Sequence, residues 1–285
     1  MTRVPDTALD DLRRRGFALI PDFIGGDLLA AAQAEVATIY PTREAYFADP
    51  AHYAKFAASQ FAGIRYFPYD RPALDALPVH PDLVDAAERF LGGGDLDVYK
   101  VELWAKYAGA TDYDQPHHRD YGNHTLVVPT ADAPHLTTIL LLSDVRLEHG
   151  PTRAVPLEHS RDRPPVPMIL QPGELVEHEV ALTGTAGTLI LYATHVFHRG
   201  TNLTGDAARF ILMTDFKRRG SPWTGKIAWP DRAISRGWPA AMAAMTVRQR
   251  DLFGFPPPGD PYWTPLTVAG VAARYPAMDM APYAA

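Results

Sequence analysis

The sequence predicts a mainly antiparallel β fold with flanking helices, built as a sandwich or jelly roll. From residue 96 to residue 216, short segments alternate apolar and polar side chains and are separated by Gly- and Pro-containing turns. No helical periodicity interrupts them, which is typical of antiparallel sheets and not of a parallel sheet with crossover helices. Before residue 96, apolar residues instead recur at helical spacing in several segments.

The first 95 residues are expected to support the β core. Helical spacing predicts a helix over 7–15, and the content of 16–24 turns to strand. We expect Asp27 to cap a helix over 28–40, whose apolar stripe packs on the core. Segment 41–80 is aromatic and Pro-containing without a clean period, which predicts mostly loop, in the manner of a lid. An amphipathic pattern then predicts a helix over 81–91, ended by three glycines.

Residues 96–219 are expected to form the jelly-roll core. Its predicted strands are 96–104, 125–128, 136–142, 174–181, 188–196 and 209–216. In the last of these, Arg209 and Asp215 share one face. If that face lines the interior of the barrel, the Arg209 guanidinium is buried and needs an anionic partner.

The remaining segment, 220–285, is rich in Trp and is expected to form a cap packed on the barrel, with a helix over 238–250. A dimer surface is the alternative for this segment. We therefore expect one domain over 1–285, made of helical support (1–95), jelly-roll core (96–219) and C-terminal cap (220–285).

Composition excludes several classes of protein. The chain of 285 residues is 47% hydrophobic and 21% charged, as for one soluble globular domain. It has no cysteine, which excludes disulfides, thiolate metal sites and Cys nucleophiles, so any metal is held by His and carboxylate. The net charge of -6, without runs of like charge, argues against nucleic acid or membrane as a partner. Residues 1–19 lack a signal-peptide apolar core, so a cytoplasmic location is expected.

The stretch around His118 and Asp120, together with His198, is the most informative feature of the chain. Two imidazoles and one carboxylate make the set that binds Fe(II) on one face and leaves the other face open. A His-x-Asp triplet alone arises by chance about once in a chain of this composition. The spacing makes the triplet more informative, because residues two apart in a strand share a face. In addition, Arg209 begins another predicted strand eleven residues after His198.

Two neighbouring histidines compete for these roles. His117 is followed two positions later by an arginine and not by a carboxylate. His195 falls on the opposite face of its strand from His198. We therefore expect His118 and His198 to be the ligands, and the other histidines to be structural or exposed.

These features resemble the phytanoyl-CoA dioxygenase family of Fe(II)/2-oxoglutarate-dependent oxygenases over most of residues 8–216. The motifs that carry the resemblance, in the family's order, are Gly16-Phe17 followed by a helix, Gln115-x-x-His118-x-Asp120, Glu148-His149-Gly150-Pro151-Thr152, and His198-Arg199-Gly200-x-Asn202 with Arg209 beyond it. The resemblance implies a double-stranded β-helix, or cupin-like jelly roll. It also implies Fe(II) held by His118, Asp120 and His198, with 2-oxoglutarate and O2 as cosubstrates.

The implied activity is hydroxylation of an unactivated C–H bond of a small molecule, with release of succinate and CO2. Arg209 would bind the distal carboxylate of 2-oxoglutarate through two N–H donors, a geometry that Lys cannot offer. Thr138 or Thr201 would add a hydroxyl to the cosubstrate site. The residues expected on the substrate side are Trp104, Tyr107, Tyr121, Asn123 and Phe197.

Two departures from the family pattern bear on this expectation. The usual Pro-Gly-Ser-His sequence is replaced by residues 156–160, so that loop differs. Related halogenases have Ala or Gly at the carboxylate position, whereas Asp120 occupies it here, which favours hydroxylation.

Two other classes of function stay open. A cupin-type isomerase or hydrolase with Zn or Mn would hold the same ligands but would have no need of a buried Arg209. A non-catalytic small-molecule binding barrel would leave the ligand set unexplained. The sequence shows no basic cluster suited to the phosphates of coenzyme A, which favours a small acid, amino acid or natural-product intermediate as substrate; the oligomeric state is open.

Overall fold

The computed structural model describes residues 3–56, 58–109, 114–120, 135–221, 229–233 and 235–284. Its helices are α1 (Asp6–Arg15), α2 (Gly26–Ile39), α3 (Arg43–Ala48), α4 (Pro72–Ala76), α5 (Pro81–Leu91), α7 (Trp229–Arg232), α8 (Trp238–Ala244), α9 (Val247–Asp251) and α10 (Pro265–Arg274). Its strands are β1 (Phe17–Ile20), β2 (Ile64–Tyr66), β3 (Leu96–Tyr107), β4 (His135–Leu141), β5 (Arg153–Ala154), β6 (Val180–Ala181), β7 (Leu189–Ala193), β8 (His198–Arg199) and β9 (Ala208–Arg218). Among these residues, no helix combines the length and the apolar character of a membrane span.

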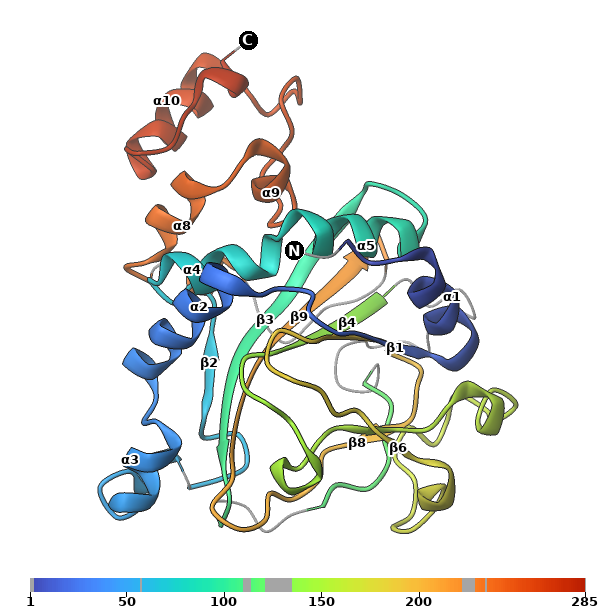
Figure 1. The fold of residues 1–285 in the computed structure, drawn as a ribbon. Coiled ribbons are helices and arrows are strands. Elements are labelled where there is room, and N and C mark those ends of the chain that lie inside the picture. Colours follow the sequence, from blue (N-terminus) through green and yellow to red (C-terminus); the bar gives the residue numbers. More distant parts are fainter. Residues whose placement is uncertain are drawn as a thin grey trace.

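Two antiparallel sheets form the predicted jelly-roll core. The larger sheet has the order β1-β7-β4-β9-β3-β2, and the smaller has the order β6-β5-β8. Helix α5 lies across β3, β9 and β4, and α1 lies beside β1 (Figure 1). Because α5 packs on β4 and β9 with an apolar face, it covers the outer side of the larger sheet.

The long strand β3 has one face on the hydrophobic core and the other on a cavity. Its odd-numbered residues from Val101 to Tyr107 belong to the core. Its even-numbered residues from Lys100 to Lys106 line the cavity. A bulge between Val98 and Lys100 sets this alternation, since it shifts the register with β9 by one residue.

The C-terminal segment packs against the same core as the barrel. Trp238 of α8 is 2% exposed. Its ring lies 5.9 Å from both Phe67 and Phe253, and Phe67 stacks on Phe253 at 5.2 Å. In Figure 1 helices α8 to α10 stand at one end of the molecule, beside α4 and α5.

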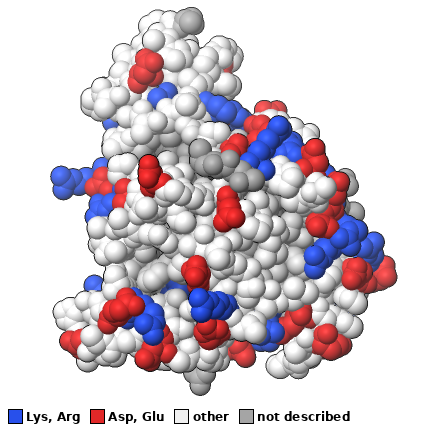
Figure 2. All heavy atoms as spheres, in the orientation of Figure 1, with Lys and Arg blue, Asp and Glu red and all other residues white. Residues whose placement is uncertain are grey.

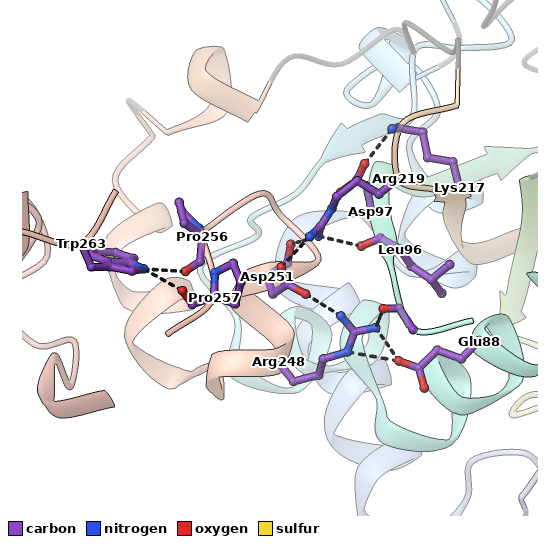
Figure 3. A network of polar contacts seen from close by, with 11 residues as sticks. Glu88, Leu96, Asp97, Lys217, Arg219, Arg248, Asp251, Pro256, Pro257 and Trp263 are labelled. Atoms are coloured by element: carbon purple, nitrogen blue, oxygen red, sulfur yellow. Dashed lines mark hydrogen bonds and ion pairs between the residues drawn. The ribbon is translucent and has the colours of Figure 1, made fainter. Parts of the chain in front are cut away.

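A network of ion pairs fastens this segment to the sheet (Figure 3). Arg219, just after β9, contacts Asp97 of β3 at 2.9 Å and Asp251 of α9 at 2.9 Å. Arg248 of α9 pairs with Asp251 at 2.5 Å and with Glu88 of α5. The polar contacts therefore run from the sheet through α9 to α5.

Most predicted elements are confirmed, and four predictions are wrong. Asp27 lies in the first turn of α2 and is not its cap, because the helix already begins at Gly26. Segment 41–80 contains α3, β2 and α4 as well as loop. The helix over 238–250 is two helices, because Thr246 turns extended and its hydroxyl accepts a hydrogen bond from the Gln249 N–H, which starts α9 anew.

The fourth wrong prediction is the strand over 174–181. Only β6 is a strand there, and a 3₁₀ turn, Val176–His178, comes before it. Leu175 has φ 63°, a left-handed conformation that no strand residue adopts. The predicted strand 125–128 lies outside the described residues.

Candidate active site

His118 and His198 lie side by side because the chain pairs their backbones. The His118 N–H donates to the His198 carbonyl at 2.9 Å, and the His198 N–H donates back at 3.0 Å. His198 belongs to β8 of the smaller sheet. Asp120 follows two residues after His118, and the ligand atoms of all three side chains lie within 4.8 Å of one another.

Backbone carbonyls orient the two imidazole rings. His118 Nδ1–H donates to the Pro116 carbonyl at 3.1 Å, and His198 Nδ1–H donates to the Val196 carbonyl at 3.1 Å. In a neutral ring this pattern leaves Nε2 free to bind a metal, as metal-binding histidines require. The two Nε2 atoms face Asp120 Oδ1 at 3.8 Å and 3.5 Å.

Tyr192 of β7 fixes the carboxylate of Asp120. Its buried hydroxyl donates to Asp120 Oδ2 at 2.9 Å. Oδ2 is thereby occupied, while Oδ1 faces the histidines. The larger sheet thus positions a carboxylate whose histidine partner comes from the smaller sheet, and an interaction of this kind typically tunes a metal ligand.

The electrostatics of the cluster suit a cation. Burial, together with His198, lowers the pKa of His118 to about 4, so its ring is neutral at physiological pH. Burial opposes ionisation of Asp120, but the interaction with His198 outweighs burial and holds the pKa of Asp120 well below its usual value. The site therefore offers a carboxylate anion and a neutral imidazole. Together with the second imidazole they form a donor set that fits Fe(II).

The cluster opens into a cavity of about 360 Å³ between the two sheets. The residues that line it are Phe61, Ile64, Tyr66, Lys100, Glu102, Trp104, Lys106, Gln115, His118, Asp120, Ile139, Thr152, Tyr192, His198, Gly200, Arg209, Ile211 and Met213. Its volume suits a small ligand.

Arg209 lies inside this cavity. It is 5% exposed, and burial lowers its pKa to about 10. Its guanidinium donates to the Gly150 carbonyl, and no carboxylate of the described residues forms an ion pair with it. Gly150 has φ 60°, and a Cβ there would lie 2.5 Å from the Thr201 carbonyl oxygen, so this turn requires glycine.

The other charged side chain of the same β9 face is neutralised. Asp215 is fully buried and lies 2.7 Å from Lys100 Nζ on β3. Lys100 also lies 3.9 Å from Glu102, whose carboxylate accepts a hydrogen bond from the Trp104 indole at 3.0 Å. Arg209 and Asp215 therefore differ in that only Asp215 has a charged partner among the described residues.

The structure places four of the predicted residues away from the cavity. Tyr107 is on the core face of β3 and stacks on Tyr46 at 4.0 Å. Phe197 is fully buried beneath the Arg119 guanidinium, 4.0 Å from it. We correct the expectation that these two aromatic rings line the substrate side.

The hydroxyls of the two predicted threonines donate to backbone carbonyls and do not face the cavity. The Thr138 hydroxyl donates to the Thr214 carbonyl at 2.9 Å, and the Thr201 hydroxyl donates to the Pro151 carbonyl at 2.7 Å. Neither lines the cavity. Of the other predicted residues, Trp104 does line it, whereas Tyr121 and Asn123 lie outside the described residues.

The two competing histidines are not part of the metal-binding cluster. His117 Nδ1–H donates to the Glu174 carbonyl at 2.8 Å, and its Nε2 lies 3.2 Å from the Glu179 carboxylate. Burial, together with the charge of Arg119, lowers the pKa of His195 to about 4. Neither ring lines the cavity.

The cavity residues that sequence reasoning missed include Tyr192, Lys106 and Gln115. Tyr192 shares strand parity with His198 but carries no motif of its own. Lys106 shares parity with Trp104. Gln115 was quoted as part of a motif without a role, and its side-chain oxygen accepts a hydrogen bond from the Gly200 N–H at 2.8 Å, which joins the two ligand-bearing segments.

Comparisons with known proteins agree with this architecture. The family model described as phytanoyl-CoA dioxygenase matches residues 12–211. Among curated protein sequences, none matches the chain.

Solved structures resemble it at low sequence identity. The carbocyclase SnoK from nogalamycin biosynthesis is 18% identical, with a TM-score of 0.57 over 82% of this chain and 92% of that one. The epimerase SnoN, solved with Fe3+, alpha ketoglutarate (2-oxoglutarate) and nogalamycin RO, is 20% identical, with a TM-score of 0.54 over 74% and 82%. EctD from S. alaskensis, solved with 2-oxoglutarate and 5-hydroxyectoine, is 17% identical, with a TM-score of 0.56 over 76% and 77%.

Proposed function

Because the chain belongs to the phytanoyl-CoA dioxygenase family, we propose that it is an Fe(II)- and 2-oxoglutarate-dependent oxygenase that hydroxylates a C–H bond of a small molecule. The observation that carries this proposal is the meeting of two features in one cavity. A cluster of two histidines and one aspartate lies there together with a buried Arg209 that has no acidic partner among the described residues.

In this proposal His118, Asp120 and His198 hold the metal. Their Nδ1 and Oδ2 atoms are occupied by backbone carbonyls and by Tyr192, so the remaining donor atoms point at one place without reorganisation. When bound, iron with 2-oxoglutarate supplies the oxidising chemistry that converts the cosubstrate to succinate and CO2.

Arg209 binds the distal carboxylate of 2-oxoglutarate. A planar guanidinium can donate two parallel N–H bonds to a carboxylate. The Gly150 carbonyl holds it in place by accepting one of its hydrogen bonds. The burial of this site excludes water from the ion pair, which strengthens it.

Hydroxylation is the finer part of the proposal. Asp120 fills the carboxylate position, and EctD was solved with a hydroxylated compound. SnoK and SnoN are named as a carbocyclase and an epimerase. All three outcomes would use the same metal and cosubstrate site, so product analysis by mass spectrometry distinguishes them once a substrate is found.

The first prediction tests the metal cluster. Purified protein with Fe(II) and O2 is expected to convert 2-oxoglutarate to succinate, slowly without substrate. His118→Ala and Asp120→Ala should abolish this turnover, because each removes one of three ligands. An anaerobic titration of Fe(II) and 2-oxoglutarate, followed by visible absorption, gives an independent readout.

His195→Ala is a matched control, since this histidine lies near the site without lining the cavity. Full succinate formation by both ligand variants would refute the assignment. A protein that binds metal but shows neither turnover nor an absorption change with 2-oxoglutarate would favour the isomerase or hydrolase alternative.

A further inference from the structure

The strand register arranges the inner face of the larger sheet in rows. Directly paired residues of antiparallel strands point to the same face with Cβ atoms about 5 Å apart. One row consists of Tyr192, Thr137, Asp215 and Lys100, and the next consists of Ile139, Met213, Glu102 and Tyr66. The first row adjoins the metal cluster through the bond of Tyr192 to Asp120. Arg209 lies two rows beyond Glu102 on this face, at the other end of the cavity.

Glu102 carries a buried negative charge that its neighbours balance only in part. Its side chain is 7% exposed and lines the cavity. Lys100 Nζ lies 2.7 Å from Asp215 but 3.9 Å from Glu102, so this lysine pairs mainly with Asp215. Burial opposes the charge of Lys100, but Asp215 and then Glu102 outweigh burial and raise its pKa. Two carboxylates therefore share one ammonium.

One oxygen of the Glu102 carboxylate is available to a ligand. Oε2 accepts a hydrogen bond from the Trp104 indole at 3.0 Å and is the oxygen that faces Lys100. Oε1 accepts no hydrogen bond from the described residues. A buried carboxylate oxygen without a donor is unfavourable, so a ligand that donates a hydrogen bond there is stabilised.

Aromatic rings lie around this carboxylate on the side of β2. Tyr66 is the register partner of Glu102, and the Phe61 ring lies 5.9 Å from Trp104 in an edge-on arrangement. Tyr66 and Phe61 are 41% and 50% exposed and line the cavity, so they connect it to solvent. The Arg232 guanidinium lies 5.6 Å from the Tyr66 ring, so this ring already accepts a cation. A carboxylate beside aromatic rings is suited to a positively charged nitrogen.

We propose that Glu102 binds the substrate and that the substrate carries a positively charged amino group. The inference rests on the proposed function, because it concerns the substrate half of the same cavity. The ammonium donates to Glu102 Oε1, and the rings of Tyr66 and Trp104 lie beside it. A small acid would instead bring a second negative charge to Glu102, which is unfavourable. Among the substrate classes that the sequence leaves open, those with an amine are therefore favoured over a small acid.

Holding Lys100 in place is the other role open to Glu102. Asp215 already contacts this ammonium at 2.7 Å, so Lys100 stays paired without Glu102. A purely structural Glu102 would change the stability of the protein without changing which ligands the cavity prefers.

The experiment compares two probes of similar shape and different charge, benzylamine and benzyl alcohol. Each is titrated by anaerobic calorimetry into protein loaded with Fe(II) and 2-oxoglutarate, at neutral pH, where benzylamine is an ammonium. Wild type should bind benzylamine about 10- to 100-fold more tightly than benzyl alcohol, the usual contribution of a hydrogen bond to a charged group.

Variants of Glu102 test whether this carboxylate causes the preference. Glu102→Gln should abolish it, and Glu102→Asp, which keeps the charge, should retain part of it. The affinity for 2-oxoglutarate should be unchanged in both variants. Glu44→Gln is the matched control, because it removes an exposed carboxylate of α3, and it should keep the wild-type preference.

The outcomes separate this inference from the proposed function. If wild type binds 2-oxoglutarate but binds benzylamine no more tightly than benzyl alcohol, the inference fails and the proposed function stands. The same holds if folded Glu102→Gln keeps the wild-type preference. If wild type binds no 2-oxoglutarate, the proposed function and the inference that rests on it both fail. Thermal unfolding checks the fold of each variant, and the wild-type comparison stays decisive if Glu102→Gln does not fold.

Discussion

Arg209 is the residue at which the oxygenase and the metal-barrel alternative differ most. Arg209→Ala should weaken 2-oxoglutarate binding by about 2 to 5 kcal/mol, since a desolvated carboxylate loses its partner. This corresponds to roughly 30-fold to several thousand-fold in affinity. Arg209→Lys should recover only part, because an ammonium lacks the planar fork. Calorimetric titration measures both, and Fe(II) binding should be retained. Unchanged affinity in folded Arg209→Ala would place the cosubstrate elsewhere.

Lys106 should reduce the stability of the ligand-free protein in a pH-dependent way. Its pKa falls from 10.5 in the unfolded chain to about 7 when folded. Above pH 10.5 it is neutral in both states. As the pH falls towards 7, the unfolded chain takes up a proton that the folded protein does not, so stability is lost until about pH 7 and is constant below it.

Lys106→Met should therefore stabilise the ligand-free protein, most strongly at or below pH 7 and little at pH 10. At about 1.4 kcal/mol per tenfold change, the gain at neutral pH is at most about 5 kcal/mol. Urea unfolding at several pH values, with Lys55→Met as control, measures this. A pH-independent difference between the variant and wild type would contradict the burial of a titrating lysine.

At the scale of single residues, the sequence predicts which side chains share a face of a strand. It does not predict whether that face is exposed to solvent or lines a cavity. Strand parity separated His198 from His195, and the structure places only His198 in the cavity. However, polar residues at alternate positions of β3 predict a face exposed to solvent. In the structure, this face lines the cavity because the smaller sheet lies opposite it.

Among the short elements, β5 and β8 depend on a buried carboxylate for their position. Glu179, just before β6, is 4% exposed at its side chain. It contacts Arg199 of β8 at 2.7 Å, Arg153 of β5 at 2.9 Å and His117 at 3.2 Å. Arg199 follows His198 in the sequence, and His117 precedes His118. Glu179 therefore contacts both segments that carry a proposed histidine ligand.

Glu179→Gln should weaken metal binding by roughly 10- to 100-fold, the usual effect of losing a group that orients metal ligands. Glu174→Gln is the matched control, because that carboxylate lies in the same segment and pairs with Arg163 at 2.9 Å. Metal affinity and thermal unfolding are measured together. A lower melting temperature with unchanged metal affinity would mean that Glu179 is structural only.

At the scale of elements, long periodic segments were predicted well and short strands were not. The pattern over 81–91 matches α5, and β3 and β9 fall where alternation predicted them. The two-residue strands β5, β6 and β8 are too short to leave a period. Their positions depend on contacts such as those of Glu179, which join residues distant in sequence.

The molecule as a whole should unfold as one unit. Trp238 in the C-terminal segment and Phe67 before α4 belong to one hydrophobic core with the barrel strands. Trp238→Ala should therefore lower the free energy of unfolding by about 3 to 5 kcal/mol. We expect one cooperative transition at a lower temperature. Two transitions in calorimetry, with only the first shifted, would show a separate C-terminal domain.

Charged side chains of both signs lie on the surface of the molecule. On the face shown in Figure 2, acidic and basic side chains of the described residues are interspersed over the surface. This agrees with the net charge of -6. On this face, the described basic side chains lie beside acidic ones.

The pairing of β1 with β7 has a consequence for synthesis of the chain in the cell. Phe17 to Ile20 of β1 pair with Leu189 to Tyr192 of β7. During synthesis, β1 therefore has no partner until the much later β7 has been translated. At about 5 to 20 residues per second, the delay is roughly 10 to 30 s. During that time a short apolar strand has an unpaired backbone edge, which makes it a binding site for chaperones and a point of aggregation. Nascent chains that stall before β7 should therefore be less soluble than the complete protein.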